Sequence, residues 1–275
     1  MDIAGKGVIV CRALTRLRQN AIYLTHLGGR FRDFFLNQAK LEQIKIEAIP
    51  CQTEIRFCTT IIERNPPQVH EIVEDGFTVN KRIEQRVRKG FMRLLPKVNY
   101  VIITGSKAKG YSQSLFPDFL KQARRMNKPV LTDIRGNDLK AILPQKPSLI
   151  KLNVEEFVFT FFSQKELNSL NEDPINQISK KLNELYQRYK IDIIITNGPH
   201  PFWLLADGKL MLKRPVAIQD PLNTTGCGDV FLAGLGLGLA HDFTLEGACE
   251  LAADLSAENA RGYRPGFIKK RSFVY

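Results

Sequence analysis

The sequence lacks the features of a membrane-spanning, secreted or zinc-binding protein. No apolar run reaches the ~18 residues that a transmembrane helix needs. The first residues, Met-Asp-Ile-Ala-Gly-Lys-Gly-Val, do not show the basic and then apolar order of a secretory signal. The 5 cysteines form no Cys-x-x-Cys pair, and the 4 histidines are scattered. We therefore expect reduced thiols in a cytoplasm, and disfavour a disulfide framework or a histidine-based metal cluster.

The composition is that of an ordinary globular chain, apart from its charge. With 275 residues, of which 44% are apolar, it can bury one large core, or one core and a small appendage. Its net charge of +12 is compatible with binding of nucleic acid or of small phosphorylated ligands, and it requires neither. Basic residues gather on predicted helices: Arg12, Arg16 and Arg18 on one, Arg82, Arg86 and Lys89 on another. Such runs are typical of solvated helix faces, and without interleaved aromatics nucleic-acid binding is disfavoured.

Helical and strand patterns alternate along most of the chain. Helices are predicted over 5–17, 31–41, 79–95, 112–126, 174–189, 228–240 and 245–259. Strands are predicted over 21–25, 45–50, 54–63, 68–73, 100–104, 129–133, 148–152, 191–196, 202–205 and 210–213. Continuous apolar strands separated by helices indicate an α/β fold with a mostly parallel sheet sandwiched by helices. We expect one domain over 1–275, with a small antiparallel β lid at about 45–73 that turns at Asn65-Pro66-Pro67.

Polar residues follow the predicted parallel strands. They are Gly105-Ser106, Asp133, Asn153 and Asn197-Gly198. Ligands of such sheets bind beyond the carboxyl ends of the strands, so these residues are expected to face one crevice. Asp133 also suits a cap for the helix that is predicted to begin near Gly136, and we favour that role for it.

The stretch Asn223-Thr-Thr-Gly-Cys-Gly-Asp229 is the most informative motif of the chain. Backbone N–H groups of a glycine-rich turn at a helix start bind anions. A carboxylate at the end of such a turn can take a proton from a hydroxyl beside the anion, so Asp229 is a candidate base. The motif thus points to phosphoryl transfer to an alcohol. The same residues also suit a simple helix start capped by Thr224 or Thr225.

Several segments resemble, in order and spacing, motifs of the ribokinase-like, phosphofructokinase-B family of sugar kinases. They are Ala4-Gly-Lys6-Gly7, Thr104-Gly-Ser106 followed by Gly110, Lys151-Leu-Asn153-Val-Glu-Glu156, and Asn223–Asp229. The resemblance is greatest to the branch that acts on phosphorylated ketohexoses, namely 1-phosphofructokinase and tagatose-6-phosphate kinase. It covers nearly the whole chain and implies a ribokinase-like fold and an ATP-dependent carbohydrate kinase that requires Mg²⁺.

The resemblance also implies roles for individual residues. Asp229 would deprotonate the acceptor hydroxyl, and the backbone N–H groups of Gly226, Cys227 and Gly228 would neutralise charge on the transferred phosphoryl group. The resemblance also implies that Mg²⁺ is bound by Asn153 and Glu156. It implies nucleotide contacts by Asn153, Asn197, Gly198, Thr225 and Asn259. The sugar phosphate would be bound by Gly5, Lys6 and Arg56.

Departures from the family pattern gather on the sugar side. Family members have a strand, part of the lid and an early Asp before the Gly-Lys-Gly loop, whereas this chain begins almost at Gly5. Ile9 stands where the family has a sugar-binding Asn, while the phosphoryl-transfer side changes only at Cys227, which replaces Ala. Three interpretations are compatible with this pattern: an altered acceptor, a chain shortened at its N-terminus, and a decayed kinase.

Some of the candidate residues also have structural interpretations. Asn153 and Glu156 have the spacing of a capping box, which is compatible with a metal role. Lys6 is also compatible with a solvated side chain, and Arg56 with a surface residue that pairs with a side chain of a neighbouring strand. The predicted partners are ATP and a sugar or sugar phosphate, with a homodimer as one option and no membrane. The alternative function is that of a non-catalytic relative that senses nucleotide or sugar phosphate.

Overall fold

A computed structural model describes residues 1–64 and 67–272 of the chain. Its internal contacts divide the chain into two units. The first unit comprises Met1–Lys97, Lys107–Ser112 and Ile218–Tyr275. The second comprises Val98–Ser106 and Gln113–Ala217.

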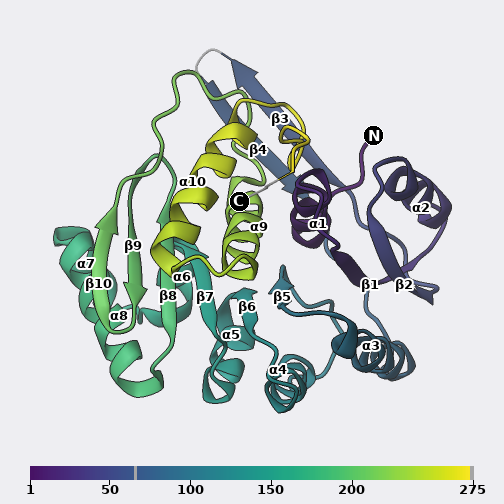
Figure 1. The fold of residues 1–275 in the computed structure, drawn as a ribbon, viewed down its shortest axis with the longest axis horizontal. Coiled ribbons are helices and arrows are strands. Elements are labelled where there is room, and N and C mark those ends of the chain that lie inside the picture. Colours follow the sequence, from purple (N-terminus) through teal and green to yellow (C-terminus); the bar gives the residue numbers. More distant parts are fainter. Residues whose placement is uncertain (65–66, 273–275) are drawn as a thin grey trace. The chain divides into compact units, whose positions relative to one another are not determined.

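The second unit is built on a six-stranded sheet with the strand order β10-β9-β8-β7-β6-β5 (Figure 1). The parallel strands are β5 (Val101–Thr104), β6 (Val130–Asp133), β7 (Leu149–Asn153) and β8 (Asp192–Asn197), followed by the antiparallel β9 (His200–Ala206) and β10 (Lys209–Lys213). The helices are α4 (Leu115–Arg125), α5 (Gly136–Ile142), α6 (Val154–Phe161), α7 (Glu166–Glu172) and α8 (Pro174–Tyr189), with a 3-10 turn at Leu143–Gln145. The predicted α/β fold with a mostly parallel sheet is confirmed.

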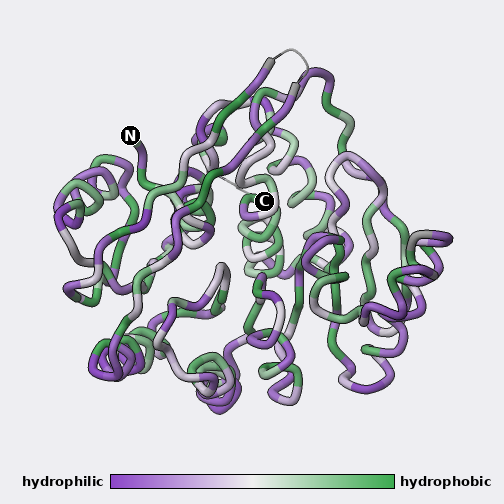
Figure 2. The backbone as a smooth tube through the Cα atoms, turned by 180° about the vertical axis from the view of Figure 1, so that it is seen from behind, coloured by the Kyte–Doolittle hydropathy of each residue, from purple (hydrophilic) through white to green (hydrophobic). Residues whose placement is uncertain are grey.

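The central strands β6, β7 and β8 are mostly buried, and most of their residues are apolar on both faces. Ile193, Ile194 and Ile195 of β8 are at most 2% exposed. Figure 2 colours hydrophobic stretches of the backbone green. A β-branched run without polar alternation is typical of a strand covered on both faces. The predicted hairpin is present as β9 and β10, where the indole N–H of the buried Trp203 donates to Ser179 Oγ at 3.1 Å.

The first unit contains two small sheets and several helices. β1 (Ile22–Gly28) pairs in parallel with β2 (Lys45–Cys51), and β3 (Cys58–Arg64) pairs antiparallel with β4 (Pro67–Val73). The helices are α1 (Lys6–Arg16), α2 (Arg32–Leu41), α3 (Lys81–Leu94), α9 (Cys227–Ala240) and α10 (Leu245–Ala260), with a 3-10 turn at Leu95–Lys97.

The predicted antiparallel patch is therefore smaller than expected. Only β3 and β4 form it, and the assignment of 45–50 to the patch was wrong, because β2 lies beside β1 in the register Ile22 to Lys45. The physical reason is α2, which connects β1 to β2: a helical crossover returns the chain to the same end of the strand and makes the pair parallel. The predicted turn at Asn65-Pro66-Pro67 includes residues outside the described part of the chain.

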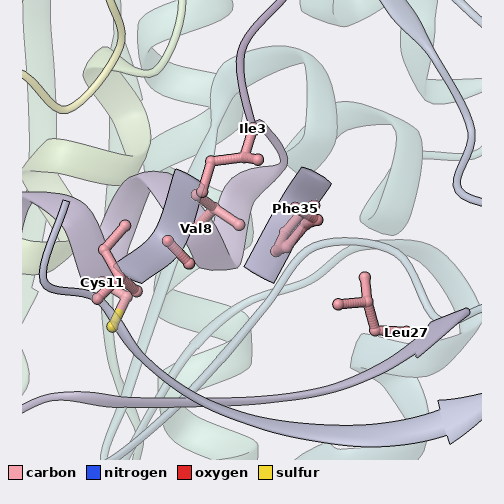
Figure 3. Close-up of a cluster of buried hydrophobic side chains, with 7 residues drawn as sticks. Ile3, Val8, Cys11, Leu27 and Phe35 are labelled. Atoms are coloured by element: carbon pink, nitrogen blue, oxygen red, sulfur yellow. The ribbon is translucent and has the colours of Figure 1, made fainter. Parts of the chain in front are cut away.

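A core cluster joins the start of the chain to β1 and α2. Ile3, Val8 and Cys11 from the N-terminal segment and α1 pack together with Leu27 of β1 and Phe35 of α2 (Figure 3). Burial raises the pKa of the Cys11 thiol to about 11. This thiol is therefore an apolar packing group at neutral pH, as expected for a buried free cysteine.

Helix α9 is buried along most of its length and packs closely on α10. A Cβ atom on Gly234 would lie 2.6 Å from Ala252 Cα, and one on Gly238 would lie 2.8 Å from Ala248 Cβ. The glycines of α9 thus allow the two backbones to approach at the small residues of α10. This packing fixes the axis of the helix that begins with the glycine-rich motif.

Arg12 of α1 differs from the solvated residue that the sequence predicts. Arg18 is exposed as expected, but Arg12 is only 2% exposed. Its guanidinium donates to Glu42 Oε2 at 2.6 Å and to the carbonyl oxygens of Ile3 at 2.8 Å and Pro265 at 2.9 Å. A planar guanidinium satisfies several acceptors at once, which allows this charge to be buried.

Candidate active site

The glycine-rich motif forms the N-terminus of α9. Gly226 is the N-cap residue, and the first intrahelical bond runs from Val230 N–H to the Gly226 carbonyl at 2.9 Å. In general, the first N–H groups of a helix lie beyond its i to i−4 bonding pattern, which makes a helix start an anion site. The N–H of Cys227 donates to the Thr224 carbonyl at 3.2 Å. Gly226 has no side chain, and neither Thr224 nor Thr225 occupies the N-cap position.

Gly226 must be glycine for two independent reasons. Its φ of 77° is in the left-handed region, which side chains with a Cβ rarely adopt. A Cβ atom at this position would also lie 2.8 Å from Pro265 Cβ and 3.2 Å from Ile9 Cγ2. Both the backbone conformation and the packing of the turn therefore depend on this residue.

Asp229 lies in the first turn of α9 and is 6% exposed. The N-terminal end of a helix carries partial positive charge, so an ionised carboxylate is favoured there. A buried carboxylate acts in a medium of low effective dielectric, where its interaction with a nearby proton donor is stronger than in water. This position suits a general base beside an anion site.

The segment before the helix is tied to residues near the C-terminal end of α10. Asn223 is 4% exposed, accepts the Thr225 N–H at 2.9 Å, and donates its amide to the Tyr263 carbonyl at 2.8 Å. The N–H groups of Leu222 and Asn223 also donate to the Ala260 carbonyl, at 2.8 and 3.3 Å. Asn223, the first residue of the motif, thus stabilises the conformation of the turn through these hydrogen bonds.

The candidate sugar-phosphate residues Gly5 and Lys6 lie at another helix N-terminus. Gly5, with φ of 110°, is the N-cap of α1, and Lys6 is its first residue. Gly7 follows, and a Cβ there would lie 2.4 Å from the ring of the half-buried Tyr23. α1 packs on α9, and Ile9, which is 5% exposed, lies against Gly226. The structure therefore brings the Gly5–Gly7 segment and the glycine-rich motif into the same part of the first unit.

Arg56 lies in the segment that connects β2 to β3, and it is exposed. The hydrogen bond from Lys109 and its positive charge lower the pKa of the Asp75 carboxyl. The charge of Arg56 lowers this pKa too, with a smaller effect. Lys109 Nζ lies 2.9 Å from Asp75 Oδ2. Arg56 therefore belongs to a charged surface cluster, and its predicted contact with a sugar phosphate stays a prediction.

The candidate metal residues belong to the second unit, where they form a complete capping box at the start of α6. Asn153 Oδ1 accepts the Glu156 N–H at 2.7 Å, and Glu156 Oε2 accepts the Asn153 N–H at 3.2 Å. Within the described residues, no group of at least 3 His, Cys, Asp or Glu is arranged to hold a metal. Mg²⁺ needs few protein ligands, however, because it keeps several waters and binds substrate phosphates.

A buried ion pair lies on the strands that lead to this capping box. Lys151 Nζ and Asp133 Oδ2 are 3.2 Å apart, and the two side chains are 3% and 1% exposed. The cap predicted for Asp133 is not observed, because Arg135 is the N-cap residue of α5 and the Gly136 N–H donates to Thr160 Oγ1 at 2.8 Å. The pair instead joins β6 to β7 at their carboxyl ends.

The candidate nucleotide residues Asn197 and Gly198 lie where β8 ends. Asn197 is the last residue of β8, and Gly198 has φ of 56° in the tight turn to β9. The register pairs Thr196 with Asn153, so the ends of β7 and β8 lie side by side. The sheet therefore places the candidate metal residue and Asn197 on neighbouring strand ends, as predicted from the alternation of strands and helices.

Asn259 is placed in α10, and it is 2% exposed. Its amide donates to the Thr225 carbonyl at 3.1 Å and to Cys227 Sγ at 3.3 Å. Ser256, one turn earlier, donates its hydroxyl to the Cys227 carbonyl at 3.1 Å. Sequence reasoning did not identify Ser256, because nothing near it in the chain indicates a contact with a turn that precedes it by 29 residues.

The sequence pattern of the pfkB family of carbohydrate kinases matches residues 1–266. The chain belongs to the pfkB family of carbohydrate kinases, and it is a kinase with the ribokinase-like α/β fold. Within residues 1–64 and 67–272, no helix combines the length and apolar character needed to cross a membrane.

Known relatives agree with this assignment. Tagatose-6-phosphate kinases from two strains of Staphylococcus epidermidis are each 24% identical to the chain over 271 residues, which are 98% of this chain and 84% of theirs. A possible 1-phosphofructokinase from Thermotoga maritima superimposes with a TM-score of 0.85 at 17% identity, covering 96% of this chain and 82% of that one. Phosphofructokinase-2 from Escherichia coli gives a TM-score of 0.82 at 16% identity, covering 97% and 84%. The predicted resemblance to this group of sugar kinases is confirmed.

Proposed function

We propose that the protein transfers the γ-phosphoryl group of ATP to a hydroxyl of a phosphorylated ketohexose. The observation that carries the proposal is the buried Asp229 in the first turn of α9, three residues after the left-handed Gly226. This arrangement combines a base with a set of N–H groups at a helix start. Because the family pattern spans both units, we take them as one kinase domain.

The chemistry assigned to these residues is simple. The acceptor hydroxyl gives its proton to Asp229 as its oxygen bonds to the γ-phosphorus, and the bond to the bridging oxygen of ADP breaks. General base catalysis contributes about 10²–10⁴-fold in rate. The N–H groups of Gly226, Cys227 and Gly228 are assigned to the charge that develops on the phosphoryl oxygens, and the Cys227 N–H is shared between this charge and the Thr224 carbonyl. Such electrostatic stabilisation contributes at least as much as general base catalysis in many enzymes.

Asn153 and Glu156 are assigned to the hydrated Mg²⁺ ion that accompanies ATP. Both offer oxygen atoms, which Mg²⁺ prefers. A carboxylate has about four acceptor sites, so the bond from the Asn153 N–H does not exhaust Glu156. When bound, the ion neutralises phosphate charge. Asn197 and Gly198 are assigned to the nucleotide because they follow the neighbouring strand.

The acceptor is proposed from the N-terminus of α1. Lys6 at a helix start supplies both a positive side chain and N–H groups for a phosphate. Tagatose-6-phosphate kinase relatives favour a phosphorylated ketohexose. Ile9 departs from the family's polar residue and is buried against Gly226. We propose that this apolar side chain alters the choice among acceptors, because a site that loses a hydrogen-bonding group changes its specificity.

An acceptor panel tests the proposal. ADP release from ATP and Mg²⁺ is measured with fructose 1-phosphate, fructose 6-phosphate, tagatose 6-phosphate and free ribose. The proposal predicts turnover with at least one phosphorylated ketohexose and a much lower kcat/KM with ribose. Preference for ribose would contradict the assignment of Lys6. ATP binding without ADP release on any acceptor would instead favour a sensor of nucleotide or sugar phosphate.

A further inference from the structure

Polar groups of α10 form hydrogen bonds with the glycine-rich turn. Cys227 and Ser256 form a reciprocal pair in which the Cys227 thiol donates to the Ser256 carbonyl at 3.5 Å and the Ser256 hydroxyl donates to the Cys227 carbonyl at 3.1 Å. Asn259, one turn further along α10, reaches Thr225 and Cys227 together. The cysteine that replaces the family's alanine is thus held by polar groups of the neighbouring helix.

Both N–H donors of the Asn259 amide, and one of the two acceptor sites of its oxygen, are engaged within the protein. Its Nδ2 group donates to the Thr225 carbonyl and to Cys227 Sγ, and its Oδ1 accepts the Gly266 N–H at 2.7 Å. A carbonyl requires a donor and an N–H requires an acceptor, so this network also fixes which way the amide faces. The residue is 2% exposed, and a nucleobase that accepts a hydrogen bond from the amide nitrogen would have to break one of the two bonds that Nδ2 donates.

The third bond connects the turn to the segment after α10. Gly266 follows Pro265, which packs against Gly226, and the Pro265 carbonyl accepts a bond from the buried Arg12. Asn259 therefore determines the position of the turn from both sides: directly through Thr225 and Cys227, and indirectly through Pro265. A displacement of about 1 Å in a catalytic group lowers rates about 10²-fold, so such support has a kinetic consequence.

We propose that Asn259, together with Ser256, is a positioning residue for phosphoryl transfer and not a nucleotide-binding residue. The inference rests on the proposed role of Asp229 and the turn. Asn259 keeps the backbone of Thr225–Cys227 in the conformation that aims the first N–H groups of α9, and it holds Asp229 in register with them. The residue acts on the transition state and leaves the affinity for the nucleotide unchanged.

Asn259→Leu and Ser256→Ala test this role. Both variants are expected to lower kcat, Asn259→Leu by about 10–100-fold, while KM for ATP and the preference for ATP over GTP stay at the wild-type values. Asp254→Leu is the matched control, because Asp254 is exposed on the same helix, and it should keep kcat. A raised KM for ATP or a lost preference for ATP would overturn the proposal, as would an unchanged kcat in both variants.

A binding measurement separates this proposal from the proposed function. Calorimetry with ADP and Mg²⁺, with and without aluminium fluoride, compares the nucleotide with a mimic of the transferred phosphoryl group. Both variants should bind ADP like the wild type and lose most of the affinity gained with aluminium fluoride. If wild-type turnover is absent, the proposed function fails, and this comparison still decides the role of Asn259. If aluminium fluoride adds no affinity in the wild type, both proposals fail. Should Asn259→Leu not fold, Ser256→Ala decides alone.

Discussion

Replacement of Arg12 by methionine is expected to destabilise the first unit strongly. The guanidinium is 2% exposed and donates to Glu42, to the Asp2 carboxylate at 3.2 Å, and to the carbonyls of Ile3 and Pro265. Breaking a buried ion pair by removing one partner costs about 3–5 kcal/mol. Methionine keeps much of the apolar volume, so the loss reports mainly the unmet polar groups.

The structure supplies a control that isolates burial from charge. Arg264 binds the same carboxylates, with contacts of 2.8 Å to Asp2 and 3.0 Å to Glu42, and it lies over the same Phe267 ring as Arg12. Its side chain, however, is 47% exposed. Exposed ion pairs contribute about 0–1 kcal/mol and exposed cation–π contacts about 0.5–1 kcal/mol. Arg264→Met should therefore cost much less than Arg12→Met.

Equilibrium unfolding in urea, followed by circular dichroism, measures both variants. Arg12→Met should lower the free energy of unfolding by about 3–5 kcal/mol, and Arg264→Met by about 1 kcal/mol. Two equal losses would refute the reasoning, because they would mean that the shared carboxylates, and not burial and the carbonyl contacts, determine the cost. A loss below about 1 kcal/mol in Arg12→Met would refute it as well.

Further predictions concern the sheet, the helix contact and the pH response. Lys151→Met should cost about 3–5 kcal/mol by leaving Asp133 buried without its ion pair, and an Asp133→Leu/Lys151→Met double variant should recover much of that loss in urea unfolding. Gly234→Ala should lower the melting temperature, because its Cβ would lie 2.6 Å from a backbone atom, whereas Gly247→Ala, with 3.4 Å to its nearest neighbour, should not. Burial lowers the pKa of His26 below 6.5, so the unfolded chain binds the proton more tightly than the folded chain. The contribution of the neutral His26 to the free energy of unfolding should be fully present above pH 6.5 and be lost as the pH falls through the folded-state pKa. The free energy of unfolding of His26→Gln should depend less on pH over this range.

Much of the fold follows from local patterns. α8 begins at Pro174 and ends at Tyr189, as predicted, because proline suits the first turn of a helix and the following Lys190 adopts the left-handed conformation that ends it. α9 begins one residue before its predicted start, because its apolar residues and the preceding glycine are adjacent in the sequence. Such signals are contained within a few neighbouring residues.

Other features depend on contacts between distant residues. The parallel pairing of β2 was missed, because a strand's own pattern does not specify its partner. Arg12 has the sequence context of a surface arginine, and its buried guanidinium is satisfied partly by distant acceptors, among them the Pro265 carbonyl 253 positions away. Asn259 meets Thr225 across 34 residues, so its bonds to the turn could not be read from its neighbours. The glycine-rich motif could be recognised from the sequence because its glycines and its carboxylate lie within a few consecutive residues.

The most direct test of the account compares Asp229→Asn with Asp242→Asn. Asp242 follows the opposite end of α9 and is exposed, so it provides the same substitution without a catalytic role. With the best acceptor and saturating ATP, Asp229→Asn should retain nucleotide binding and lose about 10²–10⁴-fold in kcat. Asp242→Asn should turn over like the wild type. A loss of less than about 10-fold in a folded Asp229→Asn variant would contradict the assignment of Asp229 as the base.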